Sequence, residues 1–102
     1  MGDIGITSYG VHIPRYRLNR KIISAAMGWI GGGNMPGEKA IANYDEDSLT
    51  MAVSAARKCT KGYDMAKLDG VFFATTTPPY REKESSAIIG NALGMRADIR
   101  TG

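Results

Sequence analysis

The sequence predicts an α/β fold in which helices cover a parallel sheet. The first observation is a short apolar run within residues 70–80, which starts at a glycine and stops in three threonines and two prolines. Such a run is typical of a strand that is buried on both faces. Helical patterns precede and follow it, as in a β-α-β unit. In open α/β sheets ligands bind beyond the carboxyl ends of the strands, so we expect a site at the polar end of this run.

The length, composition and charge of the chain are typical of one small globular domain. The chain has 102 residues, of which 43% are apolar and 23% charged, and its net charge is +3. The basic residues are spread out rather than gathered with aromatic residues, which argues against nucleic acid as a partner and favours small anions. A single cysteine, Cys59, excludes an internal disulfide framework and fits a reducing compartment. No stretch resembles a signal peptide or a membrane span, so we expect a cytoplasmic protein.

The first part of the chain predicts a strand, a helix and a loop. Alternating apolar residues predict a first strand that ends at Pro14, with its apolar side formed by Ile4, Ile6, Val11 and Ile13. Asn19 is the expected N-cap of a helix that ends at Gly28. Glycines and a proline in residues 31–37 then predict a loop.

The clearest predicted element is a second helix that Asp45 caps and Gly62 ends. Acidic residues 46–47 lie at its positive end and basic residues 57–58 at its negative end, as the helix dipole favours. Its apolar face follows helical spacing and consists of Leu49, Ala52, Val53, Ala56 and Cys59.

The last part of the chain completes the β-α-β unit. A strand is expected at residues 71–75, a third helix at 83–93 with Gly94 as its end, and the start of a further strand at 98–101. A parallel sheet this small leaves at least one face uncovered. We therefore expect these residues to be an N-terminal fragment of a longer protein.

The threonines at the end of the third predicted strand are the sharpest candidates for chemistry. Hydroxyl groups of Thr75, Thr76 and Thr77 can orient a substrate or donate a hydrogen bond to a developing oxyanion. A threonine hydroxyl does not act as a general base near neutral pH. Trp29, beside the glycine-rich loop, can stack on a planar ring or pack into a core.

Other reactive side chains favour structural roles. His12 is the only histidine and has no carboxylate near it in the sequence, so we interpret it as a partly buried structural residue. Cys59 lies on an apolar helix face near the helix end, where the dipole disfavours a thiolate. With one histidine and one cysteine, and with residues 45–47 used as helix-start charges, the sequence predicts no metal site.

Several motifs, taken together and in order, resemble the N-terminal part of the thiolase superfamily. The family most similar is that of the archaeal and bacterial hydroxymethylglutaryl-CoA synthases. The residues that carry this resemblance are Gly5–Arg17, Gly37–Ala40, Tyr44–Ala52 and Gly70–Gly94. The resemblance implies a five-layer α-β-α-β-α fold of two similar halves. Residues 1–102 then form one N-terminal thiolase-like segment, an incomplete first half.

The resemblance also implies an activity. Members of this family are homodimeric acyltransferases that form a carbon–carbon bond from acyl-CoA thioesters, without a cofactor beyond that substrate. They carry the acyl group on a cysteine that a helix N-terminus activates. By this resemblance the cysteine follows shortly after Gly102 and the catalytic histidine belongs to the second half. Residues 1–102 alone then lack the nucleophile.

One position departs from the synthase pattern. Thr76 stands where these synthases carry the glutamate that removes a proton from the acetyl methyl group. A threonine there resembles instead the 3-oxoacyl-acyl-carrier-protein synthase III enzymes, which generate their nucleophile by decarboxylation. Trp29 with Ile30 resembles a pair of that group whose tryptophan helps to hold coenzyme A, although Gly33 does not match the arginine expected next.

These resemblances indicate which residues form the expected site, and they leave three functions open. Thr76 is the expected catalytic position, and Trp29, Thr75 and Thr77 are expected to contact substrate. The first function is condensation of acyl-CoA thioesters. The second is decarboxylative condensation with an acyl-carrier protein as partner. The third is a non-catalytic partner of a thiolase or of a CoA-binding complex.

Overall fold

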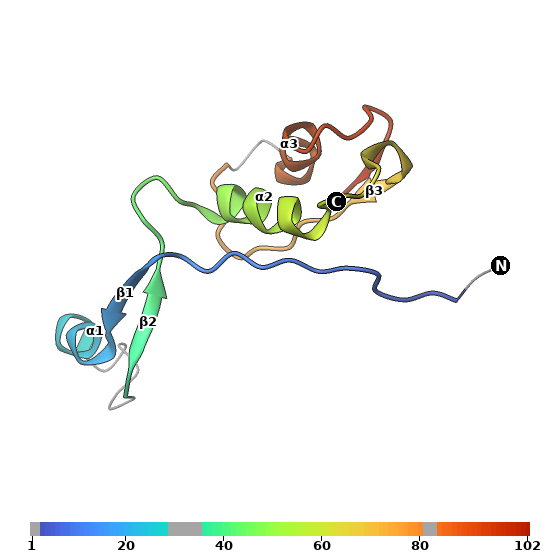
Figure 1. Ribbon diagram of the computed structural model, residues 1–102. Helices are drawn as coiled ribbons and strands as arrows, with labels where there is room; N and C mark the ends of the chain where they lie inside the picture. Colours follow the sequence, from blue (N-terminus) through green and yellow to red (C-terminus); the bar gives the residue numbers. More distant parts are fainter. Residues whose placement is uncertain (1–2, 29–35, 81–83) are drawn as a thin grey trace. The chain divides into compact units, whose positions relative to one another are not determined.

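The computed structural model describes residues 3–28, 36–80 and 84–102 (Figure 1). The chain divides into two compact units. The larger contains Met1–His12 and Glu46–Gly102, and the smaller contains Ile13–Asp45. The chain therefore leaves the larger unit after His12 and returns to it at Glu46.

The described residues of the smaller unit form two strands and a helix. Strand β1, Tyr16–Asn19, pairs antiparallel with β2, Glu38–Ile41, so that Tyr16 lies opposite Ile41. Helix α1, Arg20–Met27, follows β1 without a loop. Trp29 and most of the predicted glycine-rich loop lie outside the described residues.

The predicted ends of α1 are confirmed. The side chain of Asn19 accepts a hydrogen bond from the backbone N–H of Lys21 at 2.8 Å, which satisfies one of the free donors of the first turn. The helix closes at Gly28, whose φ of 60° lies in the left-handed region that glycine adopts without strain.

The predicted first strand is wrong in its position. Residues 4–13 are not assigned to a strand, and none of the described strands pairs with them. Alternation in a sequence indicates which side chains share a face, but a strand also needs a neighbour for its backbone groups. The described chain offers that neighbour only beyond Pro14, where β2 pairs with β1.

Residues 3–12, which we call the N-terminal segment, instead run beside helix α2, Ser48–Cys59, in the larger unit (Figure 1). The Ser8 hydroxyl donates a hydrogen bond to the carbonyl of Cys59 at 2.9 Å. A Cβ atom at Gly10 would come within 2.4 Å of the Ala55 carbonyl oxygen. His12, nearer the end of the segment, contacts Ser54, which is nearer the start of α2 than Cys59. The segment therefore runs opposite to α2 and lies close against its backbone.

The cap of α2 differs from the one expected. Asp47, rather than Asp45, accepts a hydrogen bond from the Thr50 N–H at 2.8 Å. The Thr50 hydroxyl accepts one in return from the Asp47 N–H at 2.9 Å. This reciprocal capping box is possible only for a cap three residues before Thr50, which explains why Asp47 is chosen. The predicted basic last turn of α2 is confirmed in Arg57 and Lys58.

The predicted β-α-β unit is confirmed. Strand β3, Gly70–Val71, pairs in parallel with β4, Arg100–Thr101. Helix α3, Ser85–Ala92, connects them, and a 3-10 turn, Met65–Lys67, precedes β3. The pairing extends beyond β3 through the N–H of Phe73, which donates to the Gly102 carbonyl at 2.8 Å. The strand is thus shorter than the 71–75 predicted, because the described chain provides no partner after Phe73.

The core of the larger unit lies around α3, which packs against both α2 and β3. Leu49 on α2 and Ile89 on α3 are its buried apolar side chains among the described residues, with exposures of 7% and 3%. The absence of a side chain at Gly90 lets α3 approach Ile99 and Val71 closely. No helix of the described residues is long and apolar enough to cross a membrane.

The close approach of Gly10 to α2 predicts a position-specific cost. Gly10→Ala should destabilise the protein by about 1–3 kcal/mol, because the new methyl group meets backbone atoms that cannot rotate away. The matched control is Gly5→Ala, where nothing lies within 4 Å of the added Cβ. Urea unfolding of both variants measures the difference. Equal midpoints for the two would refute the packing of this segment against α2.

Candidate functional site

Thr75, Thr76 and Thr77 form an exposed turn beyond the last paired residue of β3. We call these three residues the threonine tip. The Thr75 hydroxyl accepts a hydrogen bond from the N–H of Thr77 at 3.1 Å, which closes the turn. None of the hydrogen bonds within the described ranges uses the Thr76 hydroxyl. The tip therefore presents the Thr76 side chain to solvent, or to a ligand.

The threonine tip lies at the beginning of α2. The hydroxyl of Ser48, the first residue of that helix, donates a hydrogen bond to the Thr77 carbonyl at 2.9 Å. Sequence reasoning missed this contact, because 29 residues separate Ser48 from Thr77. The amino end of a helix carries a partial positive charge, so this place favours a ligand group on which negative charge develops.

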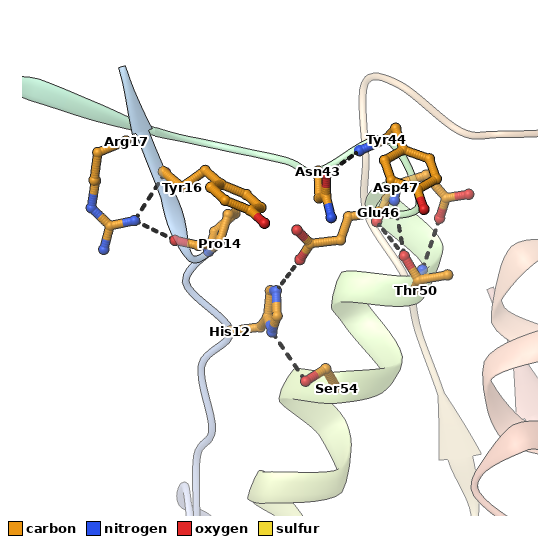
Figure 2. Close-up of polar contacts among 10 residues, drawn as sticks. All are labelled: His12, Pro14, Tyr16, Arg17, Asn43, Tyr44, Glu46, Asp47, Thr50 and Ser54. Carbon is orange, nitrogen blue, oxygen red and sulfur yellow. Dashed lines mark hydrogen bonds and ion pairs between the residues drawn. The ribbon is translucent and has the colours of Figure 1, made fainter. Parts of the chain in front are cut away.

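A second polar cluster joins the N-terminal segment to α2 (Figure 2). Nε2 of His12 lies 2.6 Å from a carboxylate oxygen of Glu46, and Nδ1 lies 3.1 Å from the Ser54 hydroxyl. The side chains of His12 and Glu46 are 22% and 19% exposed. No carboxylate lies near His12 in the sequence, but the fold brings Glu46 to it from 34 residues away. The histidine is partly buried, as expected.

The contact between His12 and Glu46 has a particular place in the chain. His12 is the last residue before the excursion of residues 13–45 and Glu46 is the first after it. The pair, which we call the His12–Glu46 clasp, holds the two ends of that excursion together. A neutral imidazole protonated on Nε2 can donate to Glu46 and accept from Ser54, so one tautomer satisfies both contacts.

The order serine–histidine–carboxylate is that of a nucleophilic triad, but its surroundings do not suit catalysis. Ser54 lies in the middle of α2, where backbone N–H groups are used by the helix itself. An oxyanion needs free, convergent N–H donors beside the nucleophile. The cluster instead fixes the N-terminal segment, as the structural interpretation of His12 predicts. The sequence carried no local signal for this cluster, because Glu46 lies before the helix cap Asp47 and His12 is 34 residues away from Glu46.

Two cavities lie near β3 and β4. The larger, of about 520 Å³, is lined by Asp69, Gly70, Phe72, Arg96, Asp98 and Arg100. Arg96 is already paired with Asp69 at 2.9 Å and with Asp98 at 3.6 Å. The second, of about 250 Å³, includes Gly90, Met95 and Ile99. Neither cavity contains a residue of the threonine tip, so neither is the predicted site.

The other candidate residues lie in different parts of the chain. The threonine tip brings Thr75 and Thr77 into direct contact, whereas the placement of Trp29 is not described. The sulfur of Cys59 lies in the last turn of α2, 3.5 Å from the Ser8 hydroxyl. In the described part of the chain, no three histidine, cysteine, aspartate or glutamate side chains gather as a metal site would require.

The chain is similar in sequence and in structure to hydroxymethylglutaryl-CoA synthases. Hydroxymethylglutaryl-CoA synthase from Pyrococcus furiosus is 36% identical over 102 residues, and the match covers 97% of this chain and 28% of that protein. A structure of hydroxymethylglutaryl-CoA synthase complexed with CoA matches with a TM-score of 0.77 at 26% identity. It covers 95% of this chain and 26% of that one. No protein-family model matches the chain.

A third comparison concerns the fold alone. OleA from Xanthomonas campestris matches with a TM-score of 0.79 at 17% identity, over 94% of this chain and 32% of its own. The architecture is therefore that of part of a thiolase-like fold, as predicted. The present chain spans about 28% of the length of the curated synthase from Pyrococcus that it matches.

The His12–Glu46 clasp predicts energetic coupling between its two residues. A double-mutant cycle with His12→Ala and Glu46→Ala should give a coupling free energy of about 1–2 kcal/mol. The interaction that is lost is a partly buried hydrogen bond between an imidazole and a carboxylate. The comparison cycle uses Arg96 and Asp69, whose side chains are 42% and 89% exposed. That surface pair should couple by about 0.5 kcal/mol or less. Unfolding in urea measures both cycles, and a clasp coupling no larger than the surface pair's would contradict the assignment.

Proposed function

We propose, because this chain is similar to hydroxymethylglutaryl-CoA synthases over nearly all of its length, that it is the N-terminal portion of a thiolase-fold acyltransferase. The enzyme would condense acyl-CoA thioesters by forming a carbon–carbon bond. The observation that carries this proposal is the 36% identity over 97% of the chain. The structural likeness to a synthase complexed with CoA supports acyl-CoA as the substrate.

The acyl group would be carried by a cysteine outside these 102 residues. Cys59 does not suit that role, because it lies in the last turn of α2, where the negative end of the helix dipole opposes a thiolate. A nucleophilic cysteine is favoured at the opposite, amino end of a helix. The proposed protein is a cytoplasmic homodimer that uses no cofactor apart from its CoA substrate.

The threonine tip would contribute to substrate binding in this enzyme. Thr76 is the proposed catalytic position, where its exposed hydroxyl donates a hydrogen bond to a carbonyl oxygen that gains negative charge. Thr75 and Thr77 form the turn that presents it. Trp29 is proposed as a contact to coenzyme A on the strength of the sequence resemblance alone.

A second candidate function follows from the identity of residue 76. A threonine cannot remove a proton from an acetyl methyl group, so Thr76 favours a nucleophile made by decarboxylation. A malonyl thioester would lose CO₂, and the electrons of the broken bond would form an enolate. The enolate carbon would attack the acyl-enzyme carbonyl and release the cysteine thiolate. An acyl-carrier protein would then be the second partner.

The proposal predicts a covalent acyl-enzyme. Incubation of the native protein that carries this chain with acetyl-CoA should add the mass of one acetyl group, as intact-protein mass spectrometry would show. Prior alkylation of cysteine should prevent the addition. Cys59→Ser should leave it unchanged, because Cys59 is not the proposed nucleophile.

Other results of this experiment would redirect the proposal. An unmodified protein would refute the acyltransferase and support a non-catalytic partner of a thiolase or CoA-binding complex. If the acyl-enzyme forms, labelled malonyl thioester distinguishes the two condensations. Release of labelled CO₂ together with product supports the decarboxylative route, and product from a second acetyl-CoA supports the synthase route.

A further inference from the structure

We propose that Ser48 is a positioning residue that holds the threonine tip and thereby sets the direction of the Thr76 hydroxyl. This inference deepens the proposed function and rests on it where catalysis is concerned. Its structural part stands on the contact between Ser48 and Thr77 alone.

The hydroxyl of Ser48 is available for this role because another residue caps the helix. A serine at a helix start usually accepts a hydrogen bond from a backbone N–H of the first turn. In α2 Asp47 accepts that bond, and Thr50 completes the capping box at 2.8 and 2.9 Å. The Ser48 hydroxyl instead donates across the fold to the Thr77 carbonyl.

The hydrogen bond from Ser48 to Thr77 restricts the backbone of the threonine tip. The N–H of Thr77 is bound to the Thr75 hydroxyl at 3.1 Å, and its carbonyl is bound to Ser48 at 2.9 Å. Pro78 follows directly, so its ring restricts the backbone of Thr77 and fixes its own φ. Both peptide groups of Thr77 are thus held, and the adjacent Thr76 is presented from a fixed base.

Loss of this anchor should affect the reacting geometry more than substrate binding. A hydroxyl that donates to a developing oxyanion must be aligned in the transition state, and small displacements are costly there. Removing the Ser48 hydroxyl leaves the capping box and the core contacts of α2 in place. The tip should therefore remain folded but move more freely.

The test compares Ser48→Ala with Ser48→Thr in the intact protein. Ser48→Ala should lower kcat by about tenfold to a hundredfold with little change in KM, because alignment rather than binding is lost. It should also speed amide hydrogen exchange at Thr77. Ser48→Thr keeps a hydroxyl and should restore both quantities. Ser54→Ala, the same change on the same helix, should leave exchange at Thr77 unaltered, because Ser54 contacts His12 instead.

The outcomes separate this inference from the proposed function. Unchanged exchange and unchanged kcat in Ser48→Ala would overturn the inference, as would a failure of Ser48→Thr to restore them. If the protein forms no acyl-enzyme but exchange at Thr77 still rises in Ser48→Ala alone, the anchoring by Ser48 stands and the acyltransferase proposal fails. If Ser48→Ala does not fold, Ser48→Cys, which keeps only a weak donor, provides the same exchange comparison.

Discussion

The arrangement of the larger unit depends on where helix α2 begins. Three consecutive residues there bind two distant segments and the first turn of α2 itself. Glu46 contacts His12, Asp47 caps the helix through Thr50, and Ser48 contacts Thr77. An α-helix turns by about 100° per residue, so a start displaced by one residue would direct the flanking side chains elsewhere. The capping box of Asp47 and Thr50 fixes the start and therefore allows the other two contacts to form together.

The described residues bury few apolar side chains, and the segment of residues 3–12 leaves several of its apolar side chains exposed. Its side chains at Ile4 and Ile6 are 100% and 90% exposed, while Leu49 and Ile89 are buried. Sheets of parallel strands are normally covered on both faces. The exposure agrees with our proposal that this chain is the N-terminal portion of a longer protein, whose other parts would cover these side chains. The chain matches 28% of the length of the Pyrococcus synthase.

Local signals in the sequence were enough to predict the helices and the β-α-β unit. Asn19 caps α1 as expected, and Gly28 and Gly94 take positive φ at helix ends. Each of these features is decided within a few residues. Contacts between distant segments were not predictable in this way. The partners Glu46 and Ser48 were interpreted only as parts of a helix start, because their contacts with His12 and Thr77 span 34 and 29 residues. The placement of the first strand failed for the same reason.

The most direct test of this account is a comparison of nuclear magnetic resonance spectra of the isotope-labelled protein and its Asp47→Ala variant. Loss of the cap costs about 1 kcal/mol and should loosen the first turn of α2. The account predicts that resonances of the His12 ring and of the Thr77 amide shift together with those of the first turn. Shifts confined to residues 46–51 would contradict it, since the clasp and the threonine tip would then be independent of where α2 begins.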